Sequence, residues 1–173
     1  VLAGDDRLDA IAMTGSSGAG KHVAEVSGMV QLHMELGGNA PALVFPDADL
    51  EAATEAATAG SLKYAGQRCS AVSRVLAHEA VHDELVERVD AAMDGWSQGD
   101  LFDPDTALGP LISESQADWV EELIDDAVGK GATLVRGGDR DGRFVEPALL
   151  ADVPHDARIV HEEQFGPVVA VTT

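Results

Sequence analysis

The sequence predicts an α/β protein whose sheet is mostly parallel, on three observations. Segments typical of helices and segments typical of strands alternate along the chain, as they do in α/β proteins. The 18 glycines fall mainly at the breaks between these segments. Apolar residues make up 45% of the 173 residues, which is enough to build a core for one ordinary domain or parts of two. We expect the element order β-α-β-β-α-β-α-α-β-β-β.

The first part of the chain predicts a strand, a helix and two further strands. Residues 9–14 form a short buried strand that runs into a glycine-rich turn at 15–20, and a helix follows to Gly28. Residues 30–36 alternate apolar and polar side chains, the period of two that is typical of a strand. A second strand is expected at 42–45.

The rest of the chain continues the alternation. Asp49 begins an alanine-rich helix, because an aspartate side chain accepts hydrogen bonds from the free N–H groups of a first turn. The elements expected after it are a strand at 72–77, a helix at 80–93, a loop at 95–110, a helix capped by Ser113 that ends at Gly129 or Gly131, and strands at 132–135, 145–150 and 167–173.

The charge balance excludes some classes of partner. The formal net charge of −20 predicts no nucleic-acid binding and no attraction to an anionic membrane, because carboxylates repel phosphates. The acidic residues are dispersed, and lysine occurs only at Lys21, Lys63 and Lys130. Dispersed carboxylates with scarce lysine lead to the hypothesis of a halophilic protein, in which salt screens the self-repulsion.

The chain has no visible targeting or membrane segment. No apolar run approaches the roughly 20 residues that span a bilayer, and no signal peptide is visible, so we expect a cytoplasmic protein. The chain starts at Val1 rather than Met, and residues 167–173 read as a strand without a closing turn. We therefore expect both ends to be truncated.

Residues 15–22 nearly complete the phosphate-loop pattern of nucleotide hydrolases. Gly15, Gly20 and Lys21 match, but His22 stands where a hydroxyl is needed to bind Mg²⁺. A phosphate-loop NTPase is therefore an alternative function. The other interpretations are a plain tight turn, or a helix N-terminus that holds a dinucleotide pyrophosphate without Mg²⁺.

Residues 78–82 match H-E-x-x-H, the zinc-protease pattern. That chemistry needs both histidines on one face of a helix, and His78 ends a strand-like run before the helix begins. We therefore expect no metal site, and two solvated histidines beside the start of a helix.

Cys69 is the only cysteine, so the chain forms no internal disulfide and no thiolate metal cluster. A lone cysteine is often an inert buried side chain. The alternative is a reactive thiol, which only its neighbours in the sequence can support.

Three segments in order carry the strongest signal. They are Met34-Glu35-Leu36-Gly37-Gly38-Asn39-Ala40-Pro41, then Gly66-Gln67-Arg68-Cys69-Ser70-Ala71, then Glu162-Glu163-Gln164-Phe165-Gly166-Pro167-Val168. In order and spacing they closely resemble the aldehyde dehydrogenase superfamily, and the resemblance covers essentially the whole chain. It implies NAD(P)-dependent oxidation of a small-molecule aldehyde to a carboxylate.

The resemblance implies two catalytic residues. Cys69 matches the nucleophile, whose thiolate forms a thiohemiacetal and then a thioester. Glu35 matches the general base that activates the hydrolytic water. Arg68 beside the thiol favours the thiolate anion.

The resemblance also implies cofactor and substrate residues. Gly15 and Ser16 match the turn beside the cofactor phosphates, Glu163 matches the glutamate that holds the nicotinamide ribose, and Phe165 matches the aromatic residue beside it. Leu36 is expected to contact the cofactor, NAD or NADP, and Ser70 the substrate.

Arg68 has two interpretations. It either binds an anionic or hydroxylated substrate or is a structural arginine bonded to a backbone carbonyl. With Tyr64 and residues 28–30, it makes the chain similar to the branch that includes non-phosphorylating glyceraldehyde-3-phosphate dehydrogenase and lactaldehyde dehydrogenase.

The resemblance implies the domain organisation as well. Residues 1–36 match the end of a Rossmann-type dinucleotide-binding domain, and residues 37–173 match most of an α/β catalytic domain that is incomplete at its C-terminus. The oxyanion-hole asparagine of the family lies upstream of this segment, so we expect the isolated chain to be inactive. The parent protein is expected to be a homodimer or homotetramer. A catalytically silent structural relative is the remaining alternative.

Overall fold

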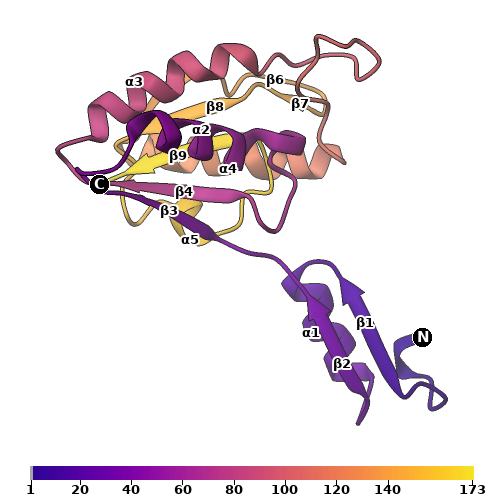
Figure 1. Cartoon of the computed structure of the whole chain (residues 1–173). Helices are drawn as coiled ribbons and strands as arrows, with labels where there is room; N and C mark the ends of the chain where they lie inside the picture. The colour runs from indigo at the N-terminus through magenta and orange to yellow at the C-terminus, as the bar shows by residue number, and fades with distance from the viewer. Residues whose placement is uncertain (1) are drawn as a thin grey trace. The chain divides into compact units, whose positions relative to one another are not determined.

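The computed structural model describes residues 2–173, which form two compact units (Figure 1). The first unit ends at Gly38 and the second is Asn39–Thr173. The α/β class is confirmed, because both units combine helices with parallel strands. The domain roles expected of residues 1–36 and 37–173 stay a prediction.

The first unit is a βαβ unit with a short helical turn before it. Its elements are η1 (Leu2–Gly4), β1 (Ala10–Thr14), α1 (Ser17–Val26) and β2 (Gln31–Glu35). β1 and β2 pair in parallel, with Thr14 opposite Glu35. The expected glycine-rich turn at 15–20 is wrong beyond Ser16, because Ser16 caps the helix and residues 17–20 already form its first turn.

The second unit is built on a five-stranded sheet in the order β3-β4-β9-β8-β5. The pairs β3–β4, β4–β9 and β9–β8 are parallel, and β5 runs antiparallel to β8 at one edge. The sheet is therefore mostly parallel, as the sequence predicts. Its strands are β3 (Ala40–Val44), β4 (Val72–Ala77), β5 (Thr133–Arg136), β8 (Ala148–Ala151) and β9 (Val168–Thr172).

Helices cover both faces of this sheet, and each face has its own core. The central strands β8 and β9 are fully buried, as expected for parallel strands with two covered faces. Leu149, Val169 and Val171 pack with α2 (Leu50–Leu62) and α3 (His82–Ala92), while Leu150 and Ala170 pack with α4 (Glu114–Gly129) and α5 (Arg158–His161). None of the helices in residues 2–173 is long and apolar enough to cross a membrane.

The structure corrects the expected elements between 137 and 161. The single strand expected at 145–150 is two strands, because Pro147 lacks the N–H that a continuous ladder needs. The first of them, β7 (Phe144–Val145), pairs with β6 (Arg140–Asp141) in a hairpin that the sequence did not predict. The short helix α5 was also missed. Two 3₁₀ turns, η2 (Lys63–Gly66) and η3 (Met93–Gly95), follow α2 and α3.

Candidate active site

Two loops that carry predicted site residues lie at the same edge of the second sheet. The first, which we call the Cys69 loop (residues 66–70), leads into β4, and the second, the Glu163 loop (residues 162–166), leads into β9. β4 and β9 are neighbouring parallel strands, so the loops that precede them meet at one edge. The topology thus brings Cys69 to the same edge as Glu163 and Phe165.

A left-handed turn directs the chain into the Cys69 loop. Tyr64, Ala65 and Gly66 have φ angles of 58°, 54° and 71°, a conformation that costs about 1–2 kcal/mol for each residue with a Cβ. At Gly66 a side chain is excluded, because its Cβ would overlap the carbonyl oxygen of Gly166. This close approach presses the Cys69 loop directly against the Glu163 loop.

Cys69 itself is exposed, as is Ser70. The expectation of a buried side chain is therefore wrong, and the reactivity of the thiol stays a prediction. An exposed thiol on a loop that its neighbours restrain is a position from which it can attack a bound substrate.

Arg68 makes the contacts of a structural arginine. Its Nη2 donates to the carbonyl oxygens of Gly60 at 2.7 Å and Ala59 at 3.4 Å, at the end of α2. Its guanidinium also lies over the ring of Tyr64, 6.0 Å from the centroid. These contacts attach the Cys69 loop to the end of α2, and a contact of Arg68 with substrate stays a prediction.

Gln67 is a site residue that the sequence reasoning missed. Its Oε1 accepts from the backbone N–H of Ile112 at 2.8 Å, and its Nε2 donates to the carbonyls of Tyr64 at 3.3 Å and Pro110 at 3.4 Å. One amide therefore holds the Cys69 loop against the segment that leads into α4. Its place between Gly66 and Arg68 in the quoted motif was the available signal.

Side chains of α4 hold the Glu163 loop. Trp119 Nε1 donates to the carbonyl of Glu163 at 3.0 Å, and Gln116 Nε2 donates to the carbonyls of Gln164 at 2.9 Å and Phe165 at 3.3 Å. Phe165 has a φ of 46°, a strained conformation for an aromatic residue that its surroundings must maintain. Neither Gln116 nor Trp119 was predicted as a site residue, and nothing in their local sequence signals the role.

In the first unit, the four other predicted residues lie at the carboxyl ends of β1 and β2. The N–H of Gly15 donates to the carbonyl of Glu35 at 3.0 Å, and Ser16 Oγ accepts from the N–H of Ala19 at 3.2 Å. The Glu35 side chain is 65% exposed, with one oxygen 3.3 Å from Nε2 of His33. Leu36 is half-buried and packs against Gly20 of α1.

The first turn of α1 fits a phosphate group. Its residues are exposed except Gly20, and it holds no acidic residue that would repel an anion. Free N–H groups at a helix N-terminus favour phosphate. The same geometry argues against an NTPase, because Gly18 and Gly20 are helical and no glycine loop remains to surround a triphosphate.

The H-E-x-x-H segment does not have zinc-protease geometry. α3 begins at His82, so His78 lies outside the helix, where its Nδ1 accepts from the N–H of Ala80. The expectation of two solvated histidines is correct for His78 and wrong for His82. His82 is 4% exposed, with Nδ1 2.9 Å from Asp83 and Nε2 3.7 Å from Asp152.

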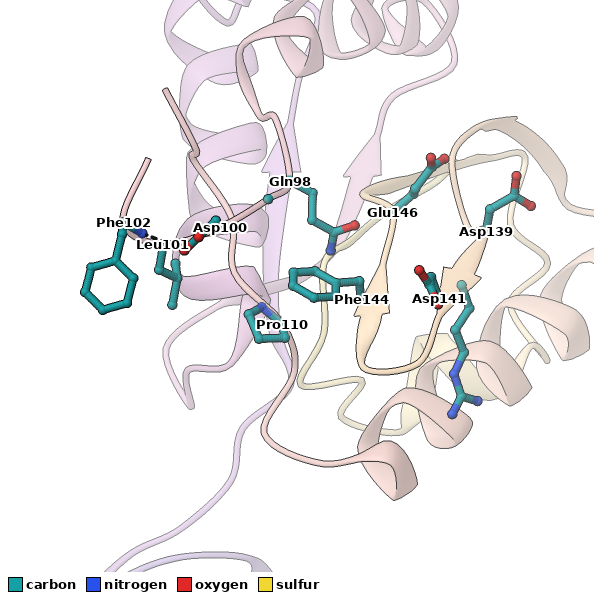
Figure 2. Close-up of a pocket in the computed structure, with 11 residues that line it drawn as sticks. Gln98, Asp100, Leu101, Phe102, Pro110, Asp139, Asp141, Phe144 and Glu146 are labelled. Atoms are coloured by element: carbon teal, nitrogen blue, oxygen red, sulfur yellow. Dashed lines mark hydrogen bonds between the residues drawn. The ribbon is translucent and has the colours of Figure 1, made fainter. Parts of the chain in front are cut away.

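One cavity of about 670 Å³ lies elsewhere in the second unit (Figure 2). The β6–β7 hairpin contributes Phe144 and the acidic side chains of Asp139, Asp141 and Glu146, and the loop after η3 contributes Leu101 and others. None of the predicted site residues lines it. The cavity is therefore not part of the site assembled around Cys69.

The chain matches the aldehyde dehydrogenase family over residues 1–173. It is 42% identical over 174 residues to a succinate-semialdehyde dehydrogenase of Paenarthrobacter nicotinovorans, an alignment that covers 98% of this chain and 39% of the relative. It is 40% identical over 164 residues to an NADP-dependent glyceraldehyde-3-phosphate dehydrogenase of Streptococcus equinus, covering 95% of this chain and 34% of that protein.

Solved structures agree with this likeness. An NADP-dependent glyceraldehyde-3-phosphate dehydrogenase from Bacillus halodurans C-125, complexed with NADP, superposes with a TM-score of 0.95 at 36% identity, covering 99% of this chain and 36% of that one. A lactaldehyde dehydrogenase from Escherichia coli gives a TM-score of 0.94 at 36% identity, covering 99% and 37%. The chain spans less than two fifths of the length of these relatives. It belongs to the aldehyde dehydrogenase family.

Proposed function

We propose that the protein oxidises a small aldehyde to a carboxylate with NAD or NADP, using Cys69 as nucleophile and Glu35 as general base. The observation that carries the proposal is the exposed Cys69 thiol on a loop that is held at the same sheet edge as Glu163 and Phe165. Family membership supports aldehyde oxidation in general. The assignment of the two catalytic roles is ours.

The chemistry divides between the two residues. The thiolate of Cys69 adds to the aldehyde carbon and gives a thiohemiacetal, and loss of hydride from that carbon leaves a thioester. Glu35 then takes a proton from water and the resulting hydroxide adds to the thioester carbonyl. Cleavage of the C–S bond returns the Cys69 thiolate and releases the carboxylic acid, which ionises to the carboxylate in solvent. The half-exposed carboxylate of Glu35 at the end of β2 is accessible to water for this step.

The residues present fit the proposed cofactor. The first turn of α1, after Gly15 and Ser16, suits the pyrophosphate, and the Glu163 loop supplies a half-buried carboxylate suited to ribose hydroxyls. Phe165, two residues further along the same loop and half-buried, would offer an apolar surface to the nicotinamide. When bound, NAD(P)⁺ accepts the hydride.

The names of relatives, rather than the geometry of the site, suggest a class of aldehyde substrate. Two of the named relatives are named for succinate semialdehyde and glyceraldehyde-3-phosphate, which carry an anionic group, and another is named for lactaldehyde, which is uncharged. Arg68 is already bonded to two carbonyls, so we propose that another group recognises any substrate anion. A cytoplasmic homodimer or homotetramer remains part of the proposal.

Turnover by the full-length protein tests the proposal. NAD(P)H absorbance would be followed with NAD and NADP separately, against a panel that includes succinate semialdehyde, glyceraldehyde-3-phosphate and lactaldehyde. We expect turnover with at least one pair, abolished by Cys69→Ala and only lowered by Ser70→Ala, because Ser70 is expected to contact the substrate but forms no covalent bond with it. Absence of turnover with every pair would support a silent structural relative instead.

A further inference from the structure

We propose that Trp119, supported by Gln116, is a positioning residue that sets the Glu163 loop for cofactor binding. The inference rests on the proposed function, since it gives a role to a residue outside the predicted site. Trp119 and Gln116 are three residues apart on α4, so both side chains project from one face of the helix. Together they donate to the carbonyls of Glu163, Gln164 and Phe165.

The Glu163 loop contains a strained residue that its surroundings must hold. Phe165 has a φ of 46°, which costs a non-glycine residue about 1–3 kcal/mol and persists only where the surroundings impose it. Three consecutive carbonyls accepting side-chain donors from one helix supply such a restraint. Since Glu163 lies at the first of these carbonyls, the hydrogen bond from the Trp119 indole sets where its side chain begins.

Trp119 is itself held in place by Arg158, which is bonded to the Glu163 loop. The guanidinium of Arg158 stacks on its ring, 4.9 Å from the centroid, and Nε of Arg158 donates to Oε1 of Glu162 at 2.9 Å. Glu162 directly precedes Glu163 in the loop. The Trp119 indole therefore contacts the Glu163 loop through its N–H and contacts Arg158, which is itself bonded to that loop, through its ring.

The segment at the start of α4 also contacts the Cys69 loop. The backbone N–H of Ile112, just before the Ser113 cap of α4, donates to Gln67. Gly66 and Gly166 place the two loops in direct contact. The start of α4 therefore fixes the position of Cys69, the nucleophile, relative to the residues proposed to hold the nicotinamide end of the cofactor.

Trp119→Phe in the full-length protein tests the inference. Phenylalanine keeps a ring for Arg158 and removes the N–H donor. Loss of one hydrogen bond of about 1 kcal/mol predicts an approximately fivefold rise in the Kd for NAD(P)H, measured from the fluorescence of the reduced cofactor, and in KM for NAD(P)⁺. The rate of Cys69 alkylation by iodoacetamide without cofactor should stay unchanged, a readout that general collapse of the site would move.

The matched control is Trp96→Phe, which changes the other of the two tryptophans in this chain, a residue that packs against both cores and lines two hollows to which the Glu163 loop contributes no residue. It should leave Kd and KM unchanged. Gln116→Met, which removes the other donor, should also raise Kd.

The outcomes separate the inference from the proposed function. Wild-type protein that binds NAD(P)H and oxidises an aldehyde, with Trp119→Phe matching Trp96→Phe in Kd, would overturn this inference alone. An equal loss of cofactor affinity and of Cys69 alkylation would also overturn it in favour of a purely structural role. Wild-type protein that neither binds NAD(P)H nor oxidises any aldehyde would overturn the proposed function and the inference with it.

Discussion

At the scale of single residues, the site depends on backbone positions that only particular residues tolerate. The Cys69 loop is entered through consecutive left-handed residues and touches the Glu163 loop where neither Gly66 nor Gly166 leaves room for a side chain. Gln67 and Arg68, which lie between Gly66 and Cys69 in the motif, donate to backbone carbonyls. Strain and close contact at a functional loop are consistent with a thiol that must be placed accurately.

Gly66→Ala should be among the most damaging single substitutions in the chain. The new Cβ would overlap the carbonyl oxygen of Gly166, which is backbone and cannot turn aside. The matched control is Gly142→Ala, where φ is 59° but no atom lies within 4 Å, so only the backbone cost of about 1–2 kcal/mol applies. Denaturant unfolding should show a much larger loss of stability for Gly66→Ala, and equal losses would contradict the close contact.

Arg68→Met should lower stability without changing substrate preference. It removes the hydrogen bonds to Gly60 and Ala59, and a charged hydrogen bond contributes about 1.5–3 kcal/mol. The ratio of kcat/KM between an anionic and a neutral aldehyde should stay at the wild-type value. A selective loss for the anionic aldehyde would show that Arg68 binds substrate after all.

At the scale of elements, most of the fold follows from local sequence and the exceptions have physical reasons. Asp49 and Ser113 cap α2 and α4 as expected, because their side chains accept from first-turn N–H groups in any context. The β6–β7 hairpin and α5 were missed, because strands of two residues and a helix of four are too short to show a period. α1 begins earlier than expected because the Ser16 cap outweighs the low helix propensity of Gly18 and Gly20.

Some residues of the candidate site could be predicted from the sequence and others could not. Cys69, Glu35 and Glu163 were named from motifs that are continuous in the sequence. Gln116 and Trp119 were not, because they act through carbonyls some 44 to 49 residues away along the chain. No local pattern encodes such a contact; only the packing of α4 beside the Glu163 loop reveals it.

Asp126 provides a pH-dependent link between α4 and α5. Its carboxylate accepts the backbone N–H of Arg158 at 2.8 Å, and this bond, with Lys130, lowers the pKa of Asp126 below its ordinary 3.8. A depressed folded-state pKa contributes stability that is present above the unfolded pKa and is lost as pH falls through the folded one.

Asp126→Asn should therefore destabilise the protein near neutral pH and have a shrinking effect as the pH falls below 3.8. Asp125→Asn, at the exposed neighbouring position, is the control. The check is thermal unfolding of both variants and the wild type from neutral pH to below 3.8. A loss of stability in Asp126→Asn that is constant with pH would contradict the role given to the Asp126 carboxylate.

At the scale of the whole molecule, carboxylates far outnumber arginines. Single arginines of the described residues form ion pairs with two carboxylates each, and most carboxylates pair with no arginine. Arg136 pairs with Asp90 and Asp94, and Arg140 pairs with Asp118 and Glu121, yet the net charge is −20. The remaining acidic groups repel one another through solvent. Cations in solution reduce this repulsion, since the Debye length falls to about 3 Å at 1 M salt.

The melting temperature of the full-length protein should accordingly rise with KCl from dilute buffer to about 1 M, where screening is nearly complete. A neutral osmolyte at the same osmolality serves as the control for solvent exclusion, and should produce a smaller rise. Full stability in dilute buffer, with no gain on adding salt, would remove the halophilic hypothesis.

The central claim is the division of labour between Cys69 and Glu35, and trapping the thioester tests it most directly. Full-length Glu35→Gln would be mixed with NAD(P)⁺ and aldehyde, and the protein mass measured alongside NAD(P)H formation. The account predicts a burst of about one NAD(P)H per site, slow turnover after it, and an acyl group on Cys69. Steady turnover at the wild-type rate, with no adduct on Cys69, would contradict it.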